Sequence, residues 1–301
     1  MTRAGFVGLA GRPNVGKSTL VNAIVGTKVA IVSDRPQTTR RAARGIATDP
    51  GAGWQMVLVD LPGVQRPRDR LTQRMQRRVE QELAGADTVL LVVNAEQGVG
   101  PGDRFIAKAL LGARGGEGAP SPVICAVNKI DRIGPGETTV VLAGVAELEA
   151  VDEVFPVSAR TGQGLDALVE RLGELLPEGP MLYAADDRRD QPSEVHLAEL
   201  IREQVLHRTR EEIPHAVEVA VHEVARRDDG LWDVRAEIWV ESESQKGILI
   251  GKGGQMVREV GVAARRELER ELGGRVFLDL EVRTRGRWRR DDALLDRLGI
   301  E

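Results

Sequence analysis

A short glycine-rich segment near the N-terminus constrains the fold more than any other feature. It reads Gly11-Arg12-Pro13-Asn14-Val15-Gly16-Lys17-Ser18, which is a glycine, four residues and then Gly-Lys-Ser. An apolar strand-like run, Gly5–Ala10, precedes it, and the apolar helical pattern of Leu20, Val21 and Ile24 follows. Such a loop directs backbone N–H groups and a helix N-terminus at phosphate oxygens. It predicts a phosphate site in which Lys17 contacts the β- and γ-phosphates, Ser18 binds Mg²⁺ and Thr19 follows in the first helical turn.

The rest of the first domain alternates short apolar runs with helical patterns. Strands are expected at Gln55–Asp60, Thr88–Ala95, Pro122–Asn128 and Glu153–Val157. Several are rich in Val, Leu and Ile without alternation, as in strands buried on both faces. The pattern predicts an α/β domain with a mostly parallel sheet and flanking helices.

Two further segments fit a Mg²⁺ and γ-phosphate site. Asp60-Leu61-Pro62-Gly63 closes a strand, so that Asp60 can hold Mg²⁺ through water and the N–H of Gly63 can approach the γ-phosphate. Thr38 and Thr39 lie in a polar stretch after the first helix. We expect a mobile loop there to supply a threonine to Mg²⁺ and the γ-phosphate, and Thr39, which directly precedes Arg40, is the preferred residue.

The choice of base depends on two later segments. In Asn128-Lys129-Ile130-Asp131, the carboxylate of Asp131 can accept two hydrogen bonds from guanine, a pair that adenine does not offer. Ser158-Ala159-Arg160 follows the last strand, where a backbone N–H can meet the guanine O6. The order and spacing of all these segments indicate a GTPase.

Length and composition limit the number of domains and the classes of protein to which the chain can belong. The 301 residues suggest two domains, and the net charge of −4 does not by itself announce a nucleic-acid binder. The single cysteine, Cys125, excludes an intramolecular disulfide and lies in a strand-like run, and no apolar run approaches the length of a membrane span. These points favour the cytoplasm.

The pattern changes after Pro177. We expect the first domain at residues 1–178, a polar linker at 179–192 and a smaller α+β domain at 193–301. The second domain has the order helix, strand, strand, helices, strand, with Asp228-Asp229-Gly230 as the turn of a hairpin.

The chain resembles the Era family of bacterial GTPases. The segments that carry the resemblance are Arg12–Ser18, Arg35–Arg40, Asp60–Gly63, Asn128–Asp131, Ala198–Glu203, Ser244–Gly254 and Arg287–Arg290. The resemblance covers nearly the whole chain. Its most specific feature is the combination of one GTPase domain with this C-terminal segment. Leu61 departs from the family, which usually has Thr, but Asp60 and Gly63 remain in place.

The resemblance and the sequence together bear on hydrolysis. Val64 stands where signalling GTPases have a glutamine that orients water, and Gln65, one residue on, is expected to be solvated rather than catalytic. We therefore expect slow intrinsic hydrolysis, with Lys17, Thr39 and Gly63 as the catalytic residues. Related GTPases with Asn in the phosphate loop use K⁺, which makes Asn14 a candidate K⁺ ligand.

The C-terminal domain contains a second candidate site. Gly251-Lys252-Gly253-Gly254 matches the Gly-x-x-Gly loop with which KH domains clamp single-stranded nucleotides, and the resemblance implies a type II KH domain. Residues 246–290 carry twelve basic and six acidic side chains, a net charge of +6. The expected RNA-binding side chains are Lys246, Lys252, Arg283, Arg285, Arg287, Trp288 and Arg289, the arginines at alternate positions meeting phosphates and Trp288 stacking on a base. The alternative for Trp288 is packing under the last helix.

The resemblance implies the partners. They are GTP and GDP, the 3′ end of 16S ribosomal RNA and the small (30S) ribosomal subunit, whose assembly the protein would assist. It also implies peripheral contact with the inner face of the membrane, and we expect a monomer. Two alternatives stay open: a tRNA-modifying GTPase, disfavoured because Cys125 is the only cysteine, and a signalling GTPase whose second domain binds protein.

Overall fold

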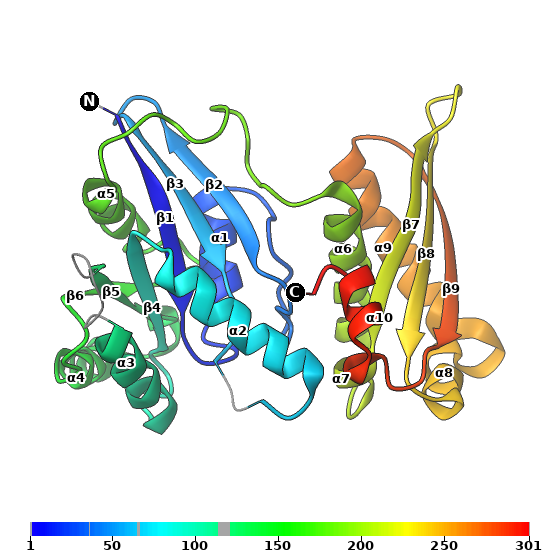
Figure 1. Ribbon diagram of the computed structural model, residues 1–301, viewed down its shortest axis with the longest axis horizontal. Helices are drawn as coiled ribbons and strands as arrows, with labels where there is room; N and C mark the ends of the chain where they lie inside the picture. The colour runs from blue at the N-terminus through cyan, green and yellow to red at the C-terminus, as the bar shows by residue number, and fades with distance from the viewer. Residues whose placement is uncertain (1, 36, 65–66, 114–120, 301) are drawn as a thin grey trace. The chain divides into compact units, whose positions relative to one another are not determined.

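The computed structural model describes residues 2–35, 37–64, 67–113 and 121–300 (Figure 1). The chain divides into two compact units. The first contains residues 1–30, 39–67 and 75–190, and the second contains residues 31–38, 68–74 and 191–301. Two short pieces of the N-terminal half therefore belong to the second unit.

The first unit is built on a sheet with the order β2-β3-β1-β4-β5-β6. The strands are β1 Arg3–Ala10, β2 Ala43–Asp49, β3 Trp54–Asp60, β4 Thr88–Asn94, β5 Val123–Asn128 and β6 Glu153–Val157. All neighbours pair in parallel except β2 and β3, which are antiparallel. The predicted mostly parallel sheet is confirmed.

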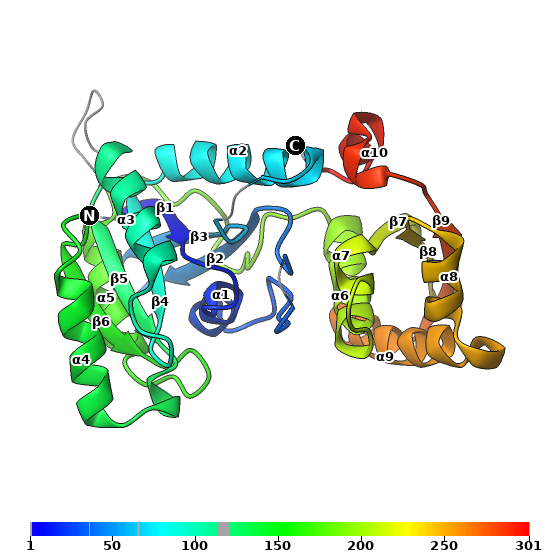
Figure 2. The same cartoon turned by 90° about the horizontal axis from the view of Figure 1, so that it is seen from below.

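Helices cover both faces of this sheet (Figure 2). Their bounds are α1 Lys17–Val25, α2 Arg70–Ala84, α3 Pro101–Ala113, α4 Pro135–Ala146 and α5 Leu165–Leu175, with the single-turn helix η1 at Ile130–Arg132. Leu20 of α1 and Leu168 of α5 share one apolar cluster with β1, β3 and β4. Ile106 of α3 and Val145 of α4 belong to the cluster on the other face. The buried strands are held between these two layers, which places the carboxyl ends of β1, β3 and β5 at one edge.

Strand β2 is the strand of this sheet that the sequence pattern did not predict. Its sequence, Ala43-Arg44-Gly45-Ile46-Ala47-Thr48-Asp49, has one strongly apolar residue and no clear alternation. It forms because it pairs residue by residue with β3, from Ala43 opposite Asp60 to Asp49 opposite Trp54. Gly45 is required there, since a Cβ would lie 2.8 Å from a methyl of Val25.

The segment expected to be a linker runs along the first unit for most of its length. The N–H of Gly179 donates to the carbonyl of Thr2, and the N–H of Ile46 donates to the carbonyl of Arg188. Tyr183 donates its hydroxyl to Asp190. The unit ends at Asp190, two residues before the expected end of the linker.

The second unit has a mixed three-stranded sheet, ordered β7-β8-β9. Strands β7 Glu218–Arg226 and β8 Trp232–Val240 are antiparallel, and β9 Val276–Thr284 is parallel to β8. The helices are α6 Ser193–Arg208, α7 Ile213–Ala216, α8 Glu243–Ile250, α9 Gln255–Leu272 and α10 Asp292–Arg297, with single turns η2 Lys252–Gly254 and η3 Trp288–Arg290. Helices α6 and α9 bury Ile201, Val260 and Ala264 against the sheet.

This order confirms the predicted α+β domain. Gly230, with φ +80°, closes the predicted hairpin turn, and its N–H donates to the carbonyl of Arg227. Among the described residues, no helix combines the length and the apolar character that crossing a membrane requires.

Candidate functional site

The phosphate loop connects β1 to α1 and depends on two glycines. Gly11 and Gly16 have φ values of +151° and +102°. Residues that carry a side chain rarely adopt such backbone angles. A Cβ on Gly16 would lie 2.3 Å from the side-chain nitrogen of Asn128. The loop therefore closes tightly enough for its backbone to surround a phosphate.

Lys17 is buried at the first position of α1. Its side chain is 6% exposed, and Nζ donates to the carbonyls of Gly11 and Arg12, both at 3.1 Å. Burial lowers its pKa to about 8, although the nearby Asp60 carboxylate acts in the opposite direction. With this pKa the amine is still mostly charged at neutral pH, and an anionic phosphate against Nζ would stabilise the charged form further.

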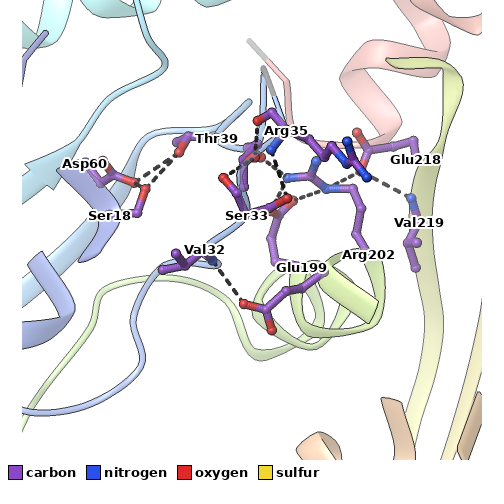
Figure 3. A network of polar contacts seen from close by, with 12 residues as sticks. Ser18, Val32, Ser33, Arg35, Thr39, Asp60, Glu199, Arg202, Glu218 and Val219 are labelled. Atoms are coloured by element: carbon purple, nitrogen blue, oxygen red, sulfur yellow. Dashed lines mark hydrogen bonds and ion pairs between the residues drawn. The ribbon is translucent and has the colours of Figure 1, made fainter. Parts of the chain in front are cut away.

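Three oxygen-bearing side chains meet beside the loop (Figure 3). Ser18 Oγ donates to Asp60 Oδ2 at 2.6 Å. Thr39 Oγ1 lies 3.1 Å from Ser18 Oγ and 3.2 Å from Asp60 Oδ2. Hydroxyl and carboxylate oxygens are the ligands that Mg²⁺ prefers, so the cluster fits this ion chemically. The hydroxyl of Thr38 donates instead to the carbonyl of Arg35 at 2.6 Å, so Thr39 is the threonine at this site.

Gly63 lies against the phosphate loop. A Cβ there would come within 2.7 Å of Pro13, so only glycine allows this approach. The next residue, Val64, donates its N–H to the carbonyl of Gly11 and packs among apolar residues of the sheet. The side chain at this position therefore has no group that orients water. Gln65 lies outside the described residues.

Asn128 joins the phosphate loop to the two segments expected at the base. Its amide nitrogen donates to the carbonyl of Val15 at 3.0 Å, and its Oδ1 accepts the N–H groups of Lys129 and Ala159. The Nζ of Lys129 donates to the carbonyl of Asn14 at 2.8 Å. These bonds tie the phosphate loop to the segments that contain Lys129 and Ala159.

Asp131 presents its carboxylate beside Ser158 and Arg160. Oδ1 accepts the Ser158 hydroxyl at 2.6 Å, and Oδ2 lies 2.8 Å from the Arg160 guanidinium. The Ser158 hydrogen bond and the Arg160 charge lower the pKa of Asp131. The group is thus an ionised acceptor, which is what guanine recognition needs. The N–H groups of Ser158 and Ala159 bond to Gln163 and Asn128 in this structure.

Two side chains of the loop region act in ways that the sequence did not indicate. Arg12 points its side chain to α3, where its Nε lies 2.9 Å from the fully buried carboxylate of Asp103. Asn22, inside α1, accepts the N–H groups of Val29 and Ala30 and donates to the carbonyl of Ala30. In the sequence, Asn22 stands out as a polar residue in the otherwise apolar run of α1, and this was the signal available for its role.

In the second unit, the predicted glycine-rich turn joins α8 to α9. Gly251, Gly253 and Gly254 have φ values of +72°, +62° and +78°. A Cβ on Gly251 would lie 2.8 Å from that of Met256, whereas no atom of the described residues lies within 4 Å of one on Gly253 or Gly254. Lys252 is exposed, and Lys246 lies in α8 on the N-terminal side of the turn. The turn thus offers an open backbone surface with the exposed side chain of Lys252 beside it.

The prediction that the arginines at alternate positions project from one face of a strand is wrong. Strand β9 ends at Thr284, and Arg287 has φ +59° before the helical turn η3. Arg283 and Arg285 both pair with Glu237, at 3.1 and 3.4 Å. Burial alone would raise the pKa of Glu237, but hydrogen bonds from Trp239, His222 and Arg285 lower it overall.

Trp288 and Arg289 are structural in this arrangement. Trp288 is fully buried and donates its indole N–H to the carbonyl of Ala216 at 2.9 Å, so its ring is not available to stack on a base. Arg289 lies 2.6 Å from Asp69 and donates to the carbonyl of His215. The packing alternative for Trp288 is the one that the structure supports.

Two family models match this chain. Residues 6–129 match a family model described as 50S ribosome-binding GTPase, and residues 212–289 match a KH domain model. The GTPase Era of Mycobacterium tuberculosis (strain H37Rv) is 46% identical over 300 residues, covering 99% of this chain and 98% of that protein. The GTPase Era of Mycobacterium sp. (strain KMS) is also 46% identical, over 302 residues and 99% of each chain.

Two solved structures are similar along the whole chain. An Aquifex aeolicus Era variant bound to GDP·AlF4⁻ has a TM-score of 0.94 at 35% identity and covers 99% of both chains. Era in complex with MgGDPNP and nucleotides 1506–1542 of 16S ribosomal RNA has a TM-score of 0.92 at 36% identity, over 100% of this chain and 99% of that one. Since relatives of this identity span the full length, the chain belongs to the Era family of GTPases.

Proposed function

We propose that this GTPase is a nucleotide-driven switch that binds the 3′ region of 16S ribosomal RNA and assists assembly of the small (30S) ribosomal subunit. The observation that carries the proposal is the open Gly251–Gly254 turn between α8 and α9 in a chain that also holds the Ser18, Thr39 and Asp60 cluster. The related Era structure with MgGDPNP and a 16S RNA fragment supports it. We assign GTP binding and hydrolysis to residues 1–178, the linker to 179–192 and RNA binding to 193–301.

The nucleotide site acts mainly by positioning. Lys17 would neutralise charge on the β- and γ-phosphates, and the N–H of Gly63 would donate to the γ-phosphate. Ser18, Thr39 and Asp60 would hold Mg²⁺, which supplies further neutralisation of phosphate charge. Asp131 would select guanine through its carboxylate. With Val64 after Gly63, no side chain at that position activates water, and we infer slow intrinsic hydrolysis.

GTP binding would stabilise the position of Thr39 and of the segment after Gly63, and hydrolysis would release them. The RNA-binding role of the second unit depends on the backbone of the turn, because no atom in the described part of the chain lies near a Cβ at Gly253 and an RNA strand can approach closely. Lys252, Lys246 and Arg287 would add charge. Arg283, Arg285 and Arg289 have acidic partners and contribute less to this role.

The test is binding of a labelled 16S 3′-end RNA to the wild type and to Gly253→Asp, each with a GTP analogue or GDP. The aspartate places negative charge in the open space at the turn, where the RNA backbone would lie. We expect GTP-dependent binding by the wild type and a loss of about tenfold or more in the variant, because like charges at close range repel strongly.

The matched control is Gly230→Asp in the β7–β8 turn. Gly230 also has positive φ (+80°) and open space around its Cβ position, so the backbone strain is similar. Its RNA affinity should stay near that of the wild type. If the wild type binds this RNA in neither nucleotide state, the proposed RNA role is wrong. The alternative of a signalling GTPase whose second domain binds protein is then favoured.

Use of K⁺ by Asn14 is a separate hypothesis. Asn14 is exposed in the phosphate loop with φ +63°, and its carbonyl accepts Lys129. A cation beside it would stabilise negative charge that develops on the phosphates. We expect faster GTP hydrolysis in K⁺ buffer than in Na⁺ buffer at equal ionic strength; equal rates would remove the hypothesis.

We also propose a cytoplasmic monomer with peripheral affinity for the inner membrane face. The likeness to Era supports this location, and the mass of 32.7 kDa gives a simple check by light scattering. Membrane affinity is tested by sedimentation with anionic lipid vesicles. Absence of cosedimentation at low salt would restrict the proposal to the cytoplasm.

A further inference from the structure

The segment Ile31–Thr38, which precedes the Mg²⁺ threonine, belongs to the second unit. Ile31 is 3% exposed and lies in the apolar core of that unit with Leu200 and Ile201 of α6. The sequence suggested a mobile, solvated loop here. The structure instead makes the segment part of the unit to which we assign RNA binding.

Side chains of α6 hold the beginning of the segment. Glu203 Oε1 accepts the N–H of Val32 at 3.0 Å, and the Nε2 of His207 lies 3.0 Å from the carbonyl of Val32. Both backbone groups of one residue are therefore bound by one helix. In the middle of the segment, Arg35 donates to the carbonyl of Thr209 at 3.1 Å.

Arg202 of α6 holds the end of the segment (Figure 3). It is fully buried, donates to the carbonyl of Thr38 and pairs with Glu199. Glu218 of β7, also fully buried, lies 3.6 Å from its Nε. Withdrawing the Thr38 carbonyl would take an acceptor from a buried charged donor, which is unfavourable. The cluster thus favours the docked segment.

Thr39 follows Thr38 through one peptide bond, and consecutive Cα atoms lie about 3.8 Å apart. Its hydroxyl meets Ser18 and Asp60 in the first unit. Docking of residues 31–38 therefore restricts where Thr39 can be, and a preordered ligand loses less conformational entropy when Mg²⁺ and the γ-phosphate arrive.

We propose that Arg202, Glu203 and His207 of α6 are positioning residues of the GTP site, which select the triphosphate by holding residues 31–38 so that Thr39 faces Ser18 and Asp60. None of the three belongs to the phosphate loop or to the other segments assigned to the nucleotide. The proposal rests on the assigned role of Thr39 toward Mg²⁺ and the γ-phosphate, and it does not depend on RNA. GDP has no γ-phosphate, so its affinity should not depend on this docking.

The experiment compares the affinities of the full chain for a fluorescent non-hydrolysable GTP analogue and for fluorescent GDP, in saturating Mg²⁺. The variants are His207→Ala, Glu203→Ala and the double variant. His207 is exposed, so its substitution is compatible with folding. For the double variant we expect GTP-analogue binding to weaken by about threefold to tenfold, the factor of one or two hydrogen bonds, with GDP binding unchanged.

Two further variants separate positioning from general damage. Glu203→Gln keeps an oxygen that can accept the Val32 N–H and should restore the wild-type ratio of the two affinities. Arg208→Ala is the matched control, because Arg208 of the same helix donates to the carbonyl and side chain of Gln204. It should behave as the wild type.

The outcomes are distinct. A fall in GTP-analogue affinity alone supports the proposal, whereas equal losses for both nucleotides, or no loss in a folded double variant, overturn it. If the wild type itself fails to bind the GTP analogue more tightly with Mg²⁺ than without, the assigned role of Thr39 is wrong, which is a failure of the proposed function and is recognised as such.

Discussion

The nucleotide site and the glycine-rich turn of the second unit are built in opposite ways. At the first, side chains interlock: Lys17 is 6% exposed, Asp60 is fully buried, and both have polar partners. At the second, Gly253 and Lys252 are exposed, and the turn is defined by side chains that are missing. Removing a side chain should therefore be severe in the first site and mild in the second, where adding bulk or negative charge is the damaging change.

The largest effect should come from Lys17→Ala. It removes the cation that neutralises the phosphates, and loss of one such preorganised group costs about 10²-fold or more in rate. GTP hydrolysis at saturating substrate is the measurement, with Lys108→Ala on α3 as the control, since Lys108 is exposed and far along the chain from the loop. A variant that retains a tenth of the wild-type rate would contradict the comparison.

A smaller effect is expected from pH. The pKa of Lys17 is about 8 without nucleotide, and phosphates raise it because they stabilise the charged form. Binding then takes up a proton above that pH, so nucleotide affinity should fall as pH rises from about 8 to 9, by up to about tenfold per unit. The lowered pKa also affects folding, because in the unfolded chain Lys17 has its ordinary pKa of 10.5. Between pH of about 8 and 10.5 unfolding therefore takes up a proton, and the free energy of unfolding rises with pH in this range.

Calorimetry of GDP binding at pH 8.5, in buffers with different ionisation enthalpies, measures this proton uptake directly. Lys17→Arg is the control, because a guanidinium keeps its proton in this range. Equal uptake in the wild type and in this variant would assign the proton to another group.

The smallest effects should lie in the second unit. Lys252→Ala should weaken RNA binding by about threefold and reduce its salt dependence by about one ion, as for one lost phosphate contact. Arg289→Ala should change RNA affinity by less than about twofold, because its guanidinium is paired with Asp69. RNA titrations at several salt concentrations test both. A larger loss for Arg289 than for Lys252 would reverse the assignment.

Much of both sites could be predicted because their chemistry is local in sequence. A phosphate loop needs Gly11, Gly16, Lys17 and Ser18 at set spacings between a strand and a helix, and the structure places them so. The carboxyl ends of β3 and β5 then bring Asp60 and Asn128 to the same edge, because parallel strands share their direction. The glycine-rich turn was likewise predictable, since its three positive φ values demand glycine.

By itself, then, the sequence determined the two-domain class, the motif residues and the order of most elements, all of which follow from local periodicity and from backbone conformations that few residues adopt. Tertiary structure alone decided the antiparallel strand β2, the burial of Trp288, the pairing of Arg289 and the membership of Ile31–Thr38 in the second unit. The physical reason is the same for each. Which partner an ambivalent polar or aromatic side chain finds depends on the free energy of packing between segments distant in sequence, and no local pattern encodes that choice.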